Sequence, residues 1–409
     1  MITINELFSG IGAQVAALKR NGIKFKVVGM SEIDKYAIKS YEAINGATRN
    51  YGDISKVESL DYADLWTYSF PCTDISLAGK QMGFTDETGK QTRSGLLFEV
   101  ERLLCKSVEK RTQPKYLLLE NVKNLVGKKF RPDFDKWLST LEGLGYNNYW
   151  KVLNAKDYGV PQNRERVFVV SIRKDVDVCG YTFPEPFKLE RRLKDILETN
   201  VDEKYYLKQE LVETFIERLS KRNTSNTIQC GGAGSVDQKY TWDLVKEPQI
   251  QQLGNVFPTK KRDNPNTRRV YDTRGIAVYL NTMGGGYREP CVVEPINTCT
   301  DGTAPALTAH LHKETVKDCT KLDRHSPALG VKEIGSEIRI RKLTPKECWR
   351  LMNFTDEEYE AAEKAGVSKT QLYKQAGNSI VVAVLTAIFK NLFQVSRNES
   401  PDWMQNWNN

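Results

Sequence analysis

Short β-rich runs alternate with helical stretches from residue 1 to about residue 175 of this 409-residue chain. The alternation is typical of an α/β domain with a mostly parallel sheet, because parallel strands need a long crossover between them, usually a helix. The expected strands are Thr3–Leu7, Phe25–Met30, Leu65–Tyr68, Tyr116–Leu119, Asn148–Leu153 and Val167–Ile172. Apolar residues at helical spacing predict helices at Gln14–Arg20, Leu96–Lys110 and Phe134–Leu144. We therefore expect a doubly wound sheet with helices on both faces.

A change in composition after Arg173 indicates a boundary between two domains. Pro184 and Pro186 lead into a polar stretch rich in Gly, Asn and Thr, which is typical of linkers and loops. The chain is also longer than the roughly 250–300 residues at which single hydrophobic cores stop growing. The expected parts are a first domain of residues 1–185 and 376–395, a second, smaller domain of residues 190–340, a connecting segment at 341–375 that returns to the first domain, and a loose tail at 396–409.

Helical signals are sparse in the second half of the chain. Within residues 190–335 they are confined to Lys204–Arg222, and short strands with long loops are expected elsewhere. Helical character returns at Thr344–Asn353. After a hinge at Ala376–Gly377, a last helix is expected at Asn378–Phe393.

The composition argues against several classes of protein. No run of about 18 apolar residues could span a bilayer, and the N-terminus has no basic region followed by an apolar segment. We therefore expect no membrane association, no secretion and a cytoplasmic location. The eight cysteines form no CxxC pair, and His310, His312 and His325 are the three histidines. Neither a disulfide framework nor a metal site is expected.

The formal net charge of +8 permits a nucleic-acid partner but does not require one. Two basic clusters are each compatible with contact to phosphate or with an ordinary solvated face. The first contains Lys260, Lys261, Arg262, Arg268, Arg269 and Arg274, and the second contains Arg339, Arg341 and Lys342.

The sequence FSGIG at residues 8–12 lies between the first strand and the first helix, and Glu32 follows at the end of the second strand. Glycine lets the backbone approach a ligand closely, and a carboxylate at this place can accept hydrogen bonds from ribose hydroxyls. A simple tight turn is the alternative. Because Ala13 and Gln14 follow the glycines, the GxGxxG pattern of a dinucleotide site is incomplete. A nucleoside without a pyrophosphate, such as S-adenosylmethionine, therefore fits better than NAD, and Asp53 could bond its adenine amino group.

Residue types that can take part in chemistry lie next to three other strands that the sequence predicts to be buried. Cys72 comes after a proline in the polar loop SFPCTDIS, an unusual place for a structural cysteine and a suitable one for a reactive thiolate. Glu120 follows the apolar run YLLL and is either a capping residue or a functional acid. Arg164 and Arg166 occupy alternate positions before a strand, so both side chains can point to the same face. Taken one at a time, these residues keep both a structural and a functional interpretation.

Together, these segments resemble the cytosine-5 DNA methyltransferase family. They occur in the family's order along the whole chain. The matching segments are LFSGIG at 7–12, FPC at 70–72, ENV at 120–122, QNRERV at 162–167, IRKLTPKECWRLMNF at 340–354 and QAGNSIVVAVLTAIF at 375–389. The resemblance implies a Rossmann-like S-adenosylmethionine-dependent methyltransferase sheet and identifies residues 190–340 as a target-recognition domain.

The resemblance also implies a mechanism. Cys72 would attack C6 of cytosine, Glu120 would contact N3, and Arg164 or Arg166 would hold the base and the developing negative charge. Transfer of the methyl group to C5 would be followed by loss of the C5 proton and release of the enzyme. Since a cytosine inside a duplex cannot be reached from both faces, the base would be flipped out of the stack.

Two sets of contact residues follow from the same resemblance. The cofactor set is Phe8, Gly10, Ile11, Gly12, Glu32, Ile33, Asp53, Ile54, Asn378 and Ser379. The DNA set is Thr73, Arg93, Ser94 and Gln162, to which the first basic cluster adds Arg268, Arg269 and Arg274. The loop from Cys72 to Arg93–Gly95 would close over DNA. Thr73 departs from the glutamine that many family members carry after the nucleophile, so the way in which this loop enters DNA is open.

Three other functions are less consistent with the sequence. A tRNA cytosine-5 methyltransferase shares the scaffold, but such enzymes carry a Cys-Phe-Thr tripeptide that this chain lacks. A catalytically inactive DNA-binding regulator would have lost the cysteine, the acid or the arginines. A NAD-dependent oxidoreductase finds no support in the glycine pattern. We therefore expect a monomeric DNA (cytosine-5-)-methyltransferase that acts on double-stranded DNA. Its target sequence, and whether a separately encoded restriction endonuclease accompanies it, stay open.

Overall fold

A computed structural model describes residues 1–71, 75, 83–84, 92, 94–210, 212–213, 252–255, 269–271, 277–278, 291–295 and 338–393. The chain divides into two compact units, Met1–Glu190 with Cys348–Asn409, and Arg191–Glu347. Most of the predicted connecting segment therefore belongs to the first unit. Some predictions fall outside the described residues: most of the Lys204–Arg222 helix, the three histidines, the tail at 396–409, and the site residues Cys72, Thr73, Arg93, Arg268 and Arg274.

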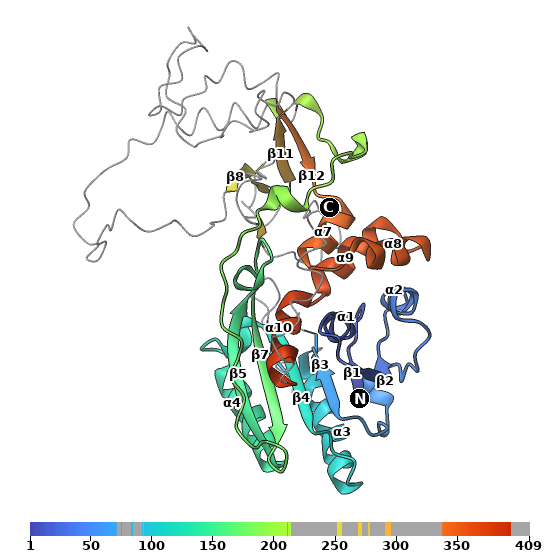
Figure 1. Ribbon diagram of the computed structural model, residues 1–409, viewed down its shortest axis with the longest axis vertical. Coiled ribbons are helices and arrows are strands. Elements are labelled where there is room, and N and C mark those ends of the chain that lie inside the picture. The colour runs from blue at the N-terminus through green and yellow to red at the C-terminus, as the bar shows by residue number, and fades with distance from the viewer. Residues whose placement is uncertain are drawn as a thin grey trace, which may run out of the picture. The chain divides into compact units, whose positions relative to one another are not determined.

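A six-stranded sheet with the order β2-β1-β3-β4-β7-β5 forms the centre of the first unit (Figure 1). Strands β2, β1, β3 and β4 are parallel, and β7 runs antiparallel to both β4 and β5. The strands are β1 Ile2–Leu7, β2 Phe25–Ser31, β3 Leu65–Tyr68, β4 Tyr116–Val122, β5 Tyr146–Asn154, the two-residue β6 Gln162–Asn163, and β7 Glu165–Arg173. The predicted α/β class with a mostly parallel sheet is confirmed.

The register of the sheet aligns the ends of its parallel strands. Leu7 pairs with both Ser31 and Tyr68, and Tyr68 pairs with Leu119. The residues one position beyond this row are Glu32, Phe8, Ser69 and Glu120. The glycine loop and the chain that leads to Cys72 therefore leave the sheet at the same edge, level with Glu120 near the end of β4, where open α/β sheets bind their ligands.

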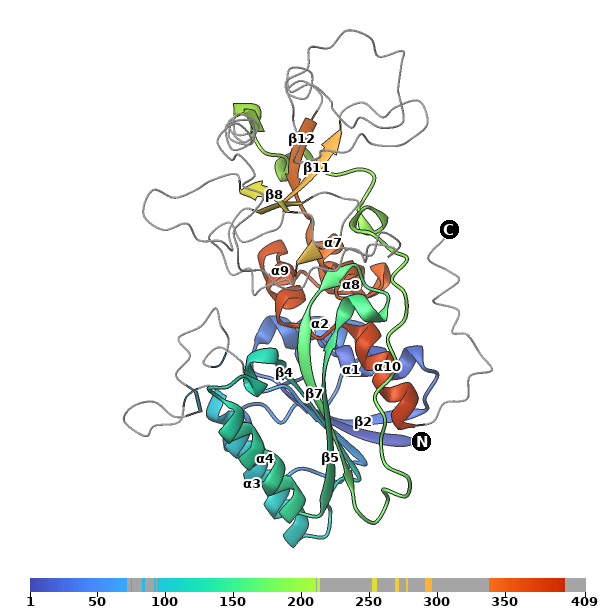
Figure 2. The same ribbon diagram turned by 90° about the vertical axis from the view of Figure 1, so that its left-hand side faces the viewer.

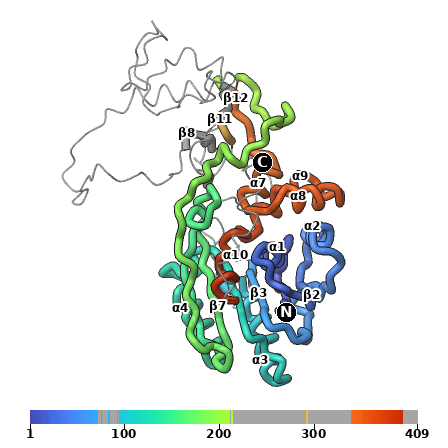
Figure 3. The backbone as a smooth tube through the Cα atoms, in the orientation of Figure 1, coloured from blue at the N-terminus to red at the C-terminus, as the bar shows by residue number. Residues whose placement is uncertain are grey.

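Helices cover both faces of this sheet. Helices α3 Leu97–Glu109 and α4 Arg131–Gly143 lie on one face, and α1 Ala13–Arg20 and α10 Val382–Leu392 lie on the other (Figure 2). Although α10 comes from the far end of the chain, it lies beside α1 (Figure 3). The other helices with described bounds are α2 Lys35–Asn45, α7 Pro345–Leu351, α8 Asp356–Lys364 and α9 Lys369–Asn378. Short 3-10 turns lie at η1 Ile54–Lys56, η2 Ser94–Leu96, η3 Lys123–Val126, η4 Ala155–Tyr158, η5 Leu193–Ile196 and η6 Glu203–Tyr205.

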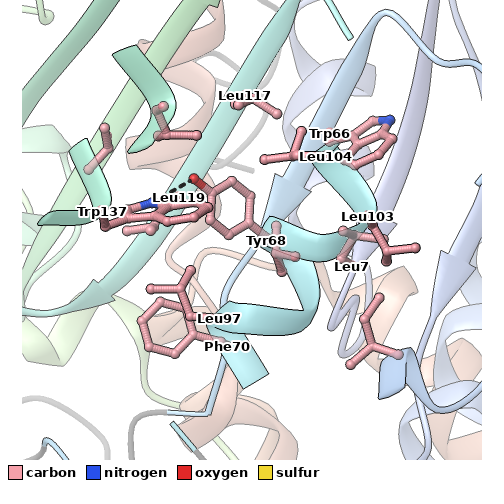
Figure 4. Packing of buried hydrophobic residues seen from close by; sticks show 14 of the residues in the cluster. Leu7, Trp66, Tyr68, Phe70, Leu97, Leu103, Leu104, Leu117, Leu119 and Trp137 are labelled. Carbon is pink, nitrogen blue, oxygen red and sulfur yellow. Dashed lines mark hydrogen bonds between the residues drawn. The ribbon is translucent and has the colours of Figure 1, made fainter. Parts of the chain in front are cut away.

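Alternating residues of β3 and β4 form the core under α3 and α4. Trp66, Tyr68, Leu117 and Leu119 are buried on this face (Figure 4). Trp137 of α4 meets the Tyr68 ring edge-on, with ring centroids 6.1 Å apart, and its indole nitrogen donates a 3.2 Å hydrogen bond to the Tyr68 hydroxyl. Truncation of a buried aromatic side chain of this kind typically costs about 3–5 kcal/mol. This core therefore supports the strands whose ends carry the candidate site.

Two helix predictions are wrong in position. The expected hinge at Ala376–Gly377 lies inside α9, and α10 begins only at Val382. A glycine in an apolar pattern suggests a hinge, but Gly377 is buried and its carbonyl accepts a hydrogen bond from Arg164. Residue 204 does not begin a long helix either, because Glu203–Tyr205 is a single 3-10 turn.

Helices α8 and α9 were not predicted, although their N-termini carry recognisable signals. Thr355 and Glu358 form a capping box at the start of α8, in which each side chain bonds the backbone amide of the other. The Ser368 side chain accepts a hydrogen bond from the Gln371 amide at the start of α9. The capping residues, rather than the weak apolar periodicity, mark these two helices.

Four of the described strands of the second unit form a sheet with the order β12-β11-β9-β8, and β10 is not part of it. Arg341 and Glu347 form a fully buried ion pair in this unit, with both carboxylate oxygens 2.8 Å from guanidinium nitrogens. Glu347 also accepts hydrogen bonds from the backbone amides of Thr344 and Glu198. The strands are β8 Gln252–Asn255, β9 Arg269–Tyr271, β10 Ala277–Val278, β11 Cys291–Pro295 and β12 Ile338–Lys342. Both interpretations of the second basic cluster are therefore wrong for Arg341, which is neither solvated nor open to phosphate.

Among the described residues, no single helix is long and apolar enough to cross a membrane, and only α9 and α10 taken together, as a bent pair, meet that length and composition. Within the same part of the chain, no group of three or more His, Cys, Asp and Glu side chains is placed to hold a metal ion.

Candidate active site

The glycine loop leaves the end of β1 through an unusual backbone path. Phe8, Gly10 and Gly12 all have positive φ angles, of 58°, 55° and 84°, which glycine adopts at low cost and other residues rarely adopt. A Cβ atom at Gly12 would lie 2.7 Å from the Asn45 Nδ2 atom and 3.0 Å from the Tyr41 ring, so this position has room for glycine alone. At Gly10 a Cβ atom would meet nothing within 4 Å. Gly10 thus presents open backbone at the sheet edge.

Glu32 ties the glycine loop to the end of β2. Its Oε2 atom accepts a 2.9 Å hydrogen bond from the Gly10 amide, and its Oε1 atom accepts from the amides of Ile33 and Asp34 at 2.8 and 2.9 Å. Ile33 beside it is 73% exposed. The structure therefore brings an acid, open backbone and an apolar surface together beside the loop.

Asn50 links Glu32 to the loop that carries Asp53, and sequence reasoning missed it. Its Oδ1 atom accepts hydrogen bonds from the amides of Glu32 and Gly52, and its Nδ2 atom donates to the Glu32 carbonyl. Asp53 caps the turn that follows, where Oδ1 accepts from the Ser55 amide and hydroxyl at 3.0 and 2.7 Å. These hydrogen bonds from Ser55 lower the pKa of Asp53 and keep it ionised.

The other predicted cofactor residues differ in exposure. The side chains of Ile11 and Ile54 are buried in the hydrophobic core, so any contact with a ligand would come from their backbones. Asn378 is exposed at the end of α9, and Ser379 follows it and is nearly buried.

Glu120 and Arg166 form an ion pair at the end of β4. The Arg166 Nε atom lies 3.4 Å from Glu120 Oε1, and both side chains are largely buried. Burial raises the pKa of Glu120, and this effect outweighs the opposing influence of Arg166, of Arg164 and of a hydrogen bond with Ser69. Glu120 therefore holds its proton to a higher pH than an ordinary glutamate.

Arg164 makes a different set of contacts from Arg166. It is buried, and its Nη2 atom donates hydrogen bonds to the carbonyls of Gly377 and Ser379 over 3.1 and 2.8 Å. A cation is favourable at the C-terminal end of a helix such as α9. The predicted arginine pair thus separates into Arg166, which pairs with the acid, and Arg164, which bonds the C-terminal segment and lowers the pKa of Glu120 through its charge.

Side chains from two other elements hold the chain around Cys72, although Cys72 and Thr73 lie outside the described residues. Asn121 Nδ2 donates a 3.1 Å hydrogen bond to the Phe70 carbonyl, and Asn124 Nδ2 donates one of 2.5 Å to the Ile75 carbonyl. Asn124 was not predicted, because an asparagine in a short turn carries no distinctive pattern.

Most predicted DNA-contact residues are not placed by the described structure. Thr73, Arg93, Arg268 and Arg274 lie outside it, and the side chain of Arg269 is not described. Ser94 and Gln162 are fully buried: Ser94 Oγ donates to the Pro71 carbonyl over 2.8 Å, and Gln162 Nε2 donates to the Leu351 carbonyl over 3.2 Å. As the chain is folded here, neither side chain is exposed to a DNA partner, and their contacts with DNA stay predictions.

Comparison with known proteins identifies the family. The family described as C-5 cytosine-specific DNA methylase matches residues 2–394. The orphan methyltransferase M.SPBetaI of Bacillus phage SPbeta is 33% identical, with 98% of this chain and 99% of the relative covered. The type II methyltransferase M2.ScrFI of Lactococcus lactis subsp. cremoris is 32% identical, with 96% and 99% covered. The solved structure of the Entamoeba histolytica methyltransferase EhMeth has a TM-score of 0.62 at 14% identity, with 96% and 98% covered, and supports the methyltransferase fold. The chain belongs to the C-5 cytosine-specific DNA methylase family.

Proposed function

We propose that this chain transfers a methyl group from S-adenosylmethionine to carbon 5 of a flipped-out cytosine within a specific sequence of double-stranded DNA. Membership of the family supports methyl transfer to cytosine in DNA. The observation that carries the proposal is the placement of Glu120, a buried carboxyl with a raised pKa that pairs with Arg166 at the same edge of the sheet as the glycine loop. A neutral carboxyl group at this edge can donate a hydrogen bond to a ring nitrogen of the base.

The glycine loop fits the nucleoside part of S-adenosylmethionine. Open backbone at Gly10 allows close approach, and an ionised carboxylate offers about four acceptor sites, so Glu32 can bond ribose beyond the three amides it already accepts from. The exposed Ile33 side chain offers an apolar surface to the adenine ring, and Asp53 can accept from its amino group. Phe8, Asn378 and Ser379 complete the proposed cofactor contacts. When bound, the cofactor supplies the electrophilic methyl group.

Cys72 is proposed as the nucleophile. Its thiolate forms a bond to C6 as the C5–C6 double bond opens, while Glu120 donates its proton toward N3 and prevents negative charge from building up on the ring. Carbon 5 would then take the methyl group, with S-adenosylhomocysteine as the leaving group. Loss of the C5 proton to water and return of the N3 proton to Glu120 would let the sulfur–C6 bond break and return the thiolate. Arg166 stabilises Glu120 once it has given up the proton.

The proposed substrate side rests on the family rather than on described contacts. Thr73, Arg93, Arg268, Arg269 and Arg274 are proposed to contact DNA, and the target base is proposed to leave the stack because both its faces must be reached. We further propose that the protein acts as a cytoplasmic monomer. Since the relatives include an orphan phage enzyme and a type II enzyme, a separately encoded restriction endonuclease is an optional partner.

Transfer of tritium from labelled S-adenosylmethionine to duplex DNA tests this function. We expect Cys72→Ser to abolish both label transfer and the covalent complex with DNA that contains 5-fluorocytosine. Its affinity for the cofactor should stay within about twofold, since the cysteine attacks the base and not the cofactor. Cys179→Ser is the matched control, because it changes an exposed cysteine far along the chain.

The outcomes separate the alternatives. Turnover by the Cys72→Ser variant would contradict the nucleophile assignment. Label in tRNA but not in DNA would favour a tRNA methyltransferase, and DNA binding without label in either would favour an inactive regulator. Bisulfite sequencing of DNA from cells that express the protein then gives the target sequence.

A further inference from the structure

Two successive peptide groups just before Cys72 are held by side chains from other parts of the fold. Asn121 bonds the Phe70 carbonyl, and Ser94 bonds the Pro71 carbonyl over 2.8 Å. A carbonyl lies in one plane with the amide nitrogen of the next residue, because the peptide bond has partial double-bond character. The Ser94 hydroxyl therefore acts on the peptide group that Pro71 shares with Cys72.

The proline makes this single hydrogen bond decisive for the local backbone. The pyrrolidine ring limits φ of Pro71 to about −65°. The remaining soft angle, ψ of Pro71, turns the Pro71 carbonyl and the Cys72 amide together. With the Phe70 carbonyl held by Asn121 and the Pro71 carbonyl held by Ser94, little freedom remains in the backbone that enters Cys72.

Ser94 is itself firmly placed. It is fully buried at the start of η2, directly before the long helix α3. The Gly95 amide donates to the Thr92 carbonyl, and Thr92 bonds the Gly83 carbonyl through its hydroxyl over 2.5 Å. The Ser94 side chain is buried, and its hydrogen bond to the half-buried Pro71 carbonyl is lost if the hydroxyl is removed. The position thus supplies a rigid donor aimed at the backbone beside Cys72.

We propose that Ser94 is a positioning residue for Cys72: its hydroxyl orients the Pro71–Cys72 peptide group so that the thiolate meets C6 of the target cytosine. This inference rests on the proposed function, because it requires Cys72 to be the nucleophile. It assigns Ser94 an internal role in place of the DNA contact that the sequence suggested. A displacement of a reacting atom by about 1 Å can cost about 100-fold in rate, so one such bond can matter.

The variant Ser94→Ala tests the inference, because it removes only the hydroxyl. We expect kcat and the rate of covalent trapping by 5-fluorocytosine DNA to fall by about 10- to 100-fold. The Kd values for duplex DNA and for S-adenosylmethionine should stay within about twofold, because the role proposed for this buried hydroxyl is internal and involves neither ligand. Ser107→Ala is the matched control, since Ser107 is also buried and its hydroxyl also donates to a backbone carbonyl, that of Leu104, over 2.7 Å. The control should trap DNA at the wild-type rate.

Trapping by Ser94→Ala at the wild-type rate would overturn the inference and leave the proposed function intact. An equal slowing in Ser107→Ala would also overturn it, because the effect would then reflect a general loss of stability. Failure of the wild-type protein to form any trapped complex, with label transfer to DNA preserved, would overturn the assignment of Cys72 and this inference together.

Discussion

The glycine loop and the Glu120 edge belong to the same sheet, but they are held in place by different kinds of contact. Glu32 bonds Gly10, 22 positions away, and its own neighbours Ile33 and Asp34. Arg164 bonds the carbonyls of Gly377 and Ser379, which are 213 and 215 positions away. The cofactor side is therefore organised within one βαβ unit, whereas the catalytic side is complete only when the C-terminal helices have docked.

One helix connects the two regions. Lys374 of α9 donates a 2.7 Å hydrogen bond to Asp34, which caps α2 directly after the Glu32 loop. Gln375 donates to the Tyr36 carbonyl in the same turn. The end of the same helix carries Gly377, which accepts from Arg164. Contacts made by α9 thus reach both regions. On the catalytic side, the end of this helix also bonds a buried cation, Arg164.

The largest expected effect is on the catalytic side, at Glu120. Glu120→Ala should slow single-turnover methyl transfer by about 10²- to 10⁴-fold, the usual contribution of a positioned acid. Glu120→Gln should lose less, because its amide can still donate a hydrogen bond. The cofactor Kd should change little in either variant if the two regions are held independently, and loss of cofactor binding in both would break the comparison.

The pH dependence of the same step sharpens this assignment. Because burial raises the pKa of Glu120, the neutral donor persists above the ordinary glutamate range and is lost as pH rises through the raised value. The wild-type rate should therefore fall across that window, while the rate of Glu120→Gln should not. Folding stability should change in the same direction. Because the folded state holds the Glu120 proton more tightly than the unfolded state, this proton stabilises the fold at low pH, and the stabilisation is lost as pH rises from the unfolded pKa through the folded pKa. Identical profiles for the two proteins would rule out Glu120 as the donor.

Arg164→Ala should have the next largest effect, and mainly on stability. It leaves two buried carbonyls without their donor, so the free energy of unfolding should fall by about 3 kcal/mol. Urea unfolding measures this change. Arg131→Ala is the control, because its ion pair with Asp135 on α4 is solvent-exposed and should contribute less than about 1 kcal/mol. A loss no larger than that of the control would show that docking of the C-terminal segment does not depend on Arg164.

Gly12→Ala probes the cofactor side with a smaller expected cost. The new Cβ atom would adopt a left-handed backbone conformation and would also collide with Asn45 and Tyr41, so about 2–3 kcal/mol of stability should be lost. Gly22→Ala shares the positive φ but meets nothing within 4 Å, and it should lose only about 1 kcal/mol. Thermal unfolding of the two variants separates the collision from the backbone effect. Equal losses would mean that Tyr41 and Asn45 yield without cost.

Glu32→Gln should give the smallest effect. The amide keeps one acceptor oxygen, so the loop should stay folded, but S-adenosylmethionine should bind about tenfold more weakly, equivalent to about 1.4 kcal/mol. Calorimetric titration measures the affinity, and trapping of 5-fluorocytosine DNA at saturating cofactor should be unchanged. An unaltered cofactor affinity would remove Glu32 from the proposed site.

The success of sequence reasoning differs between particular residues for a physical reason. The strand Tyr116–Val122 was predicted in part, as Tyr116–Leu119, because a strand buried on both faces reads as a continuous apolar run, and this run ends at Leu119. Arg341 was misjudged as a surface cation, since its burial depends on Glu347 and on the Glu198 amide that also bonds Glu347. Ser94 and Gln162 were expected to face DNA, and no local pattern indicates that both are buried.

The sequence by itself determined the α/β class, the strand positions, the glycine loop and the family resemblance, because these depend on periodicity, on backbone conformation and on the order of short segments. Tertiary structure alone decided which arginine pairs with Glu120, what Arg164 holds and which side chain bonds the Pro71 carbonyl. Those contacts join residues far apart in the chain. Burial, which raises the pKa of Glu120 and makes each such hydrogen bond costly to lose, exists only once these distant segments have come together.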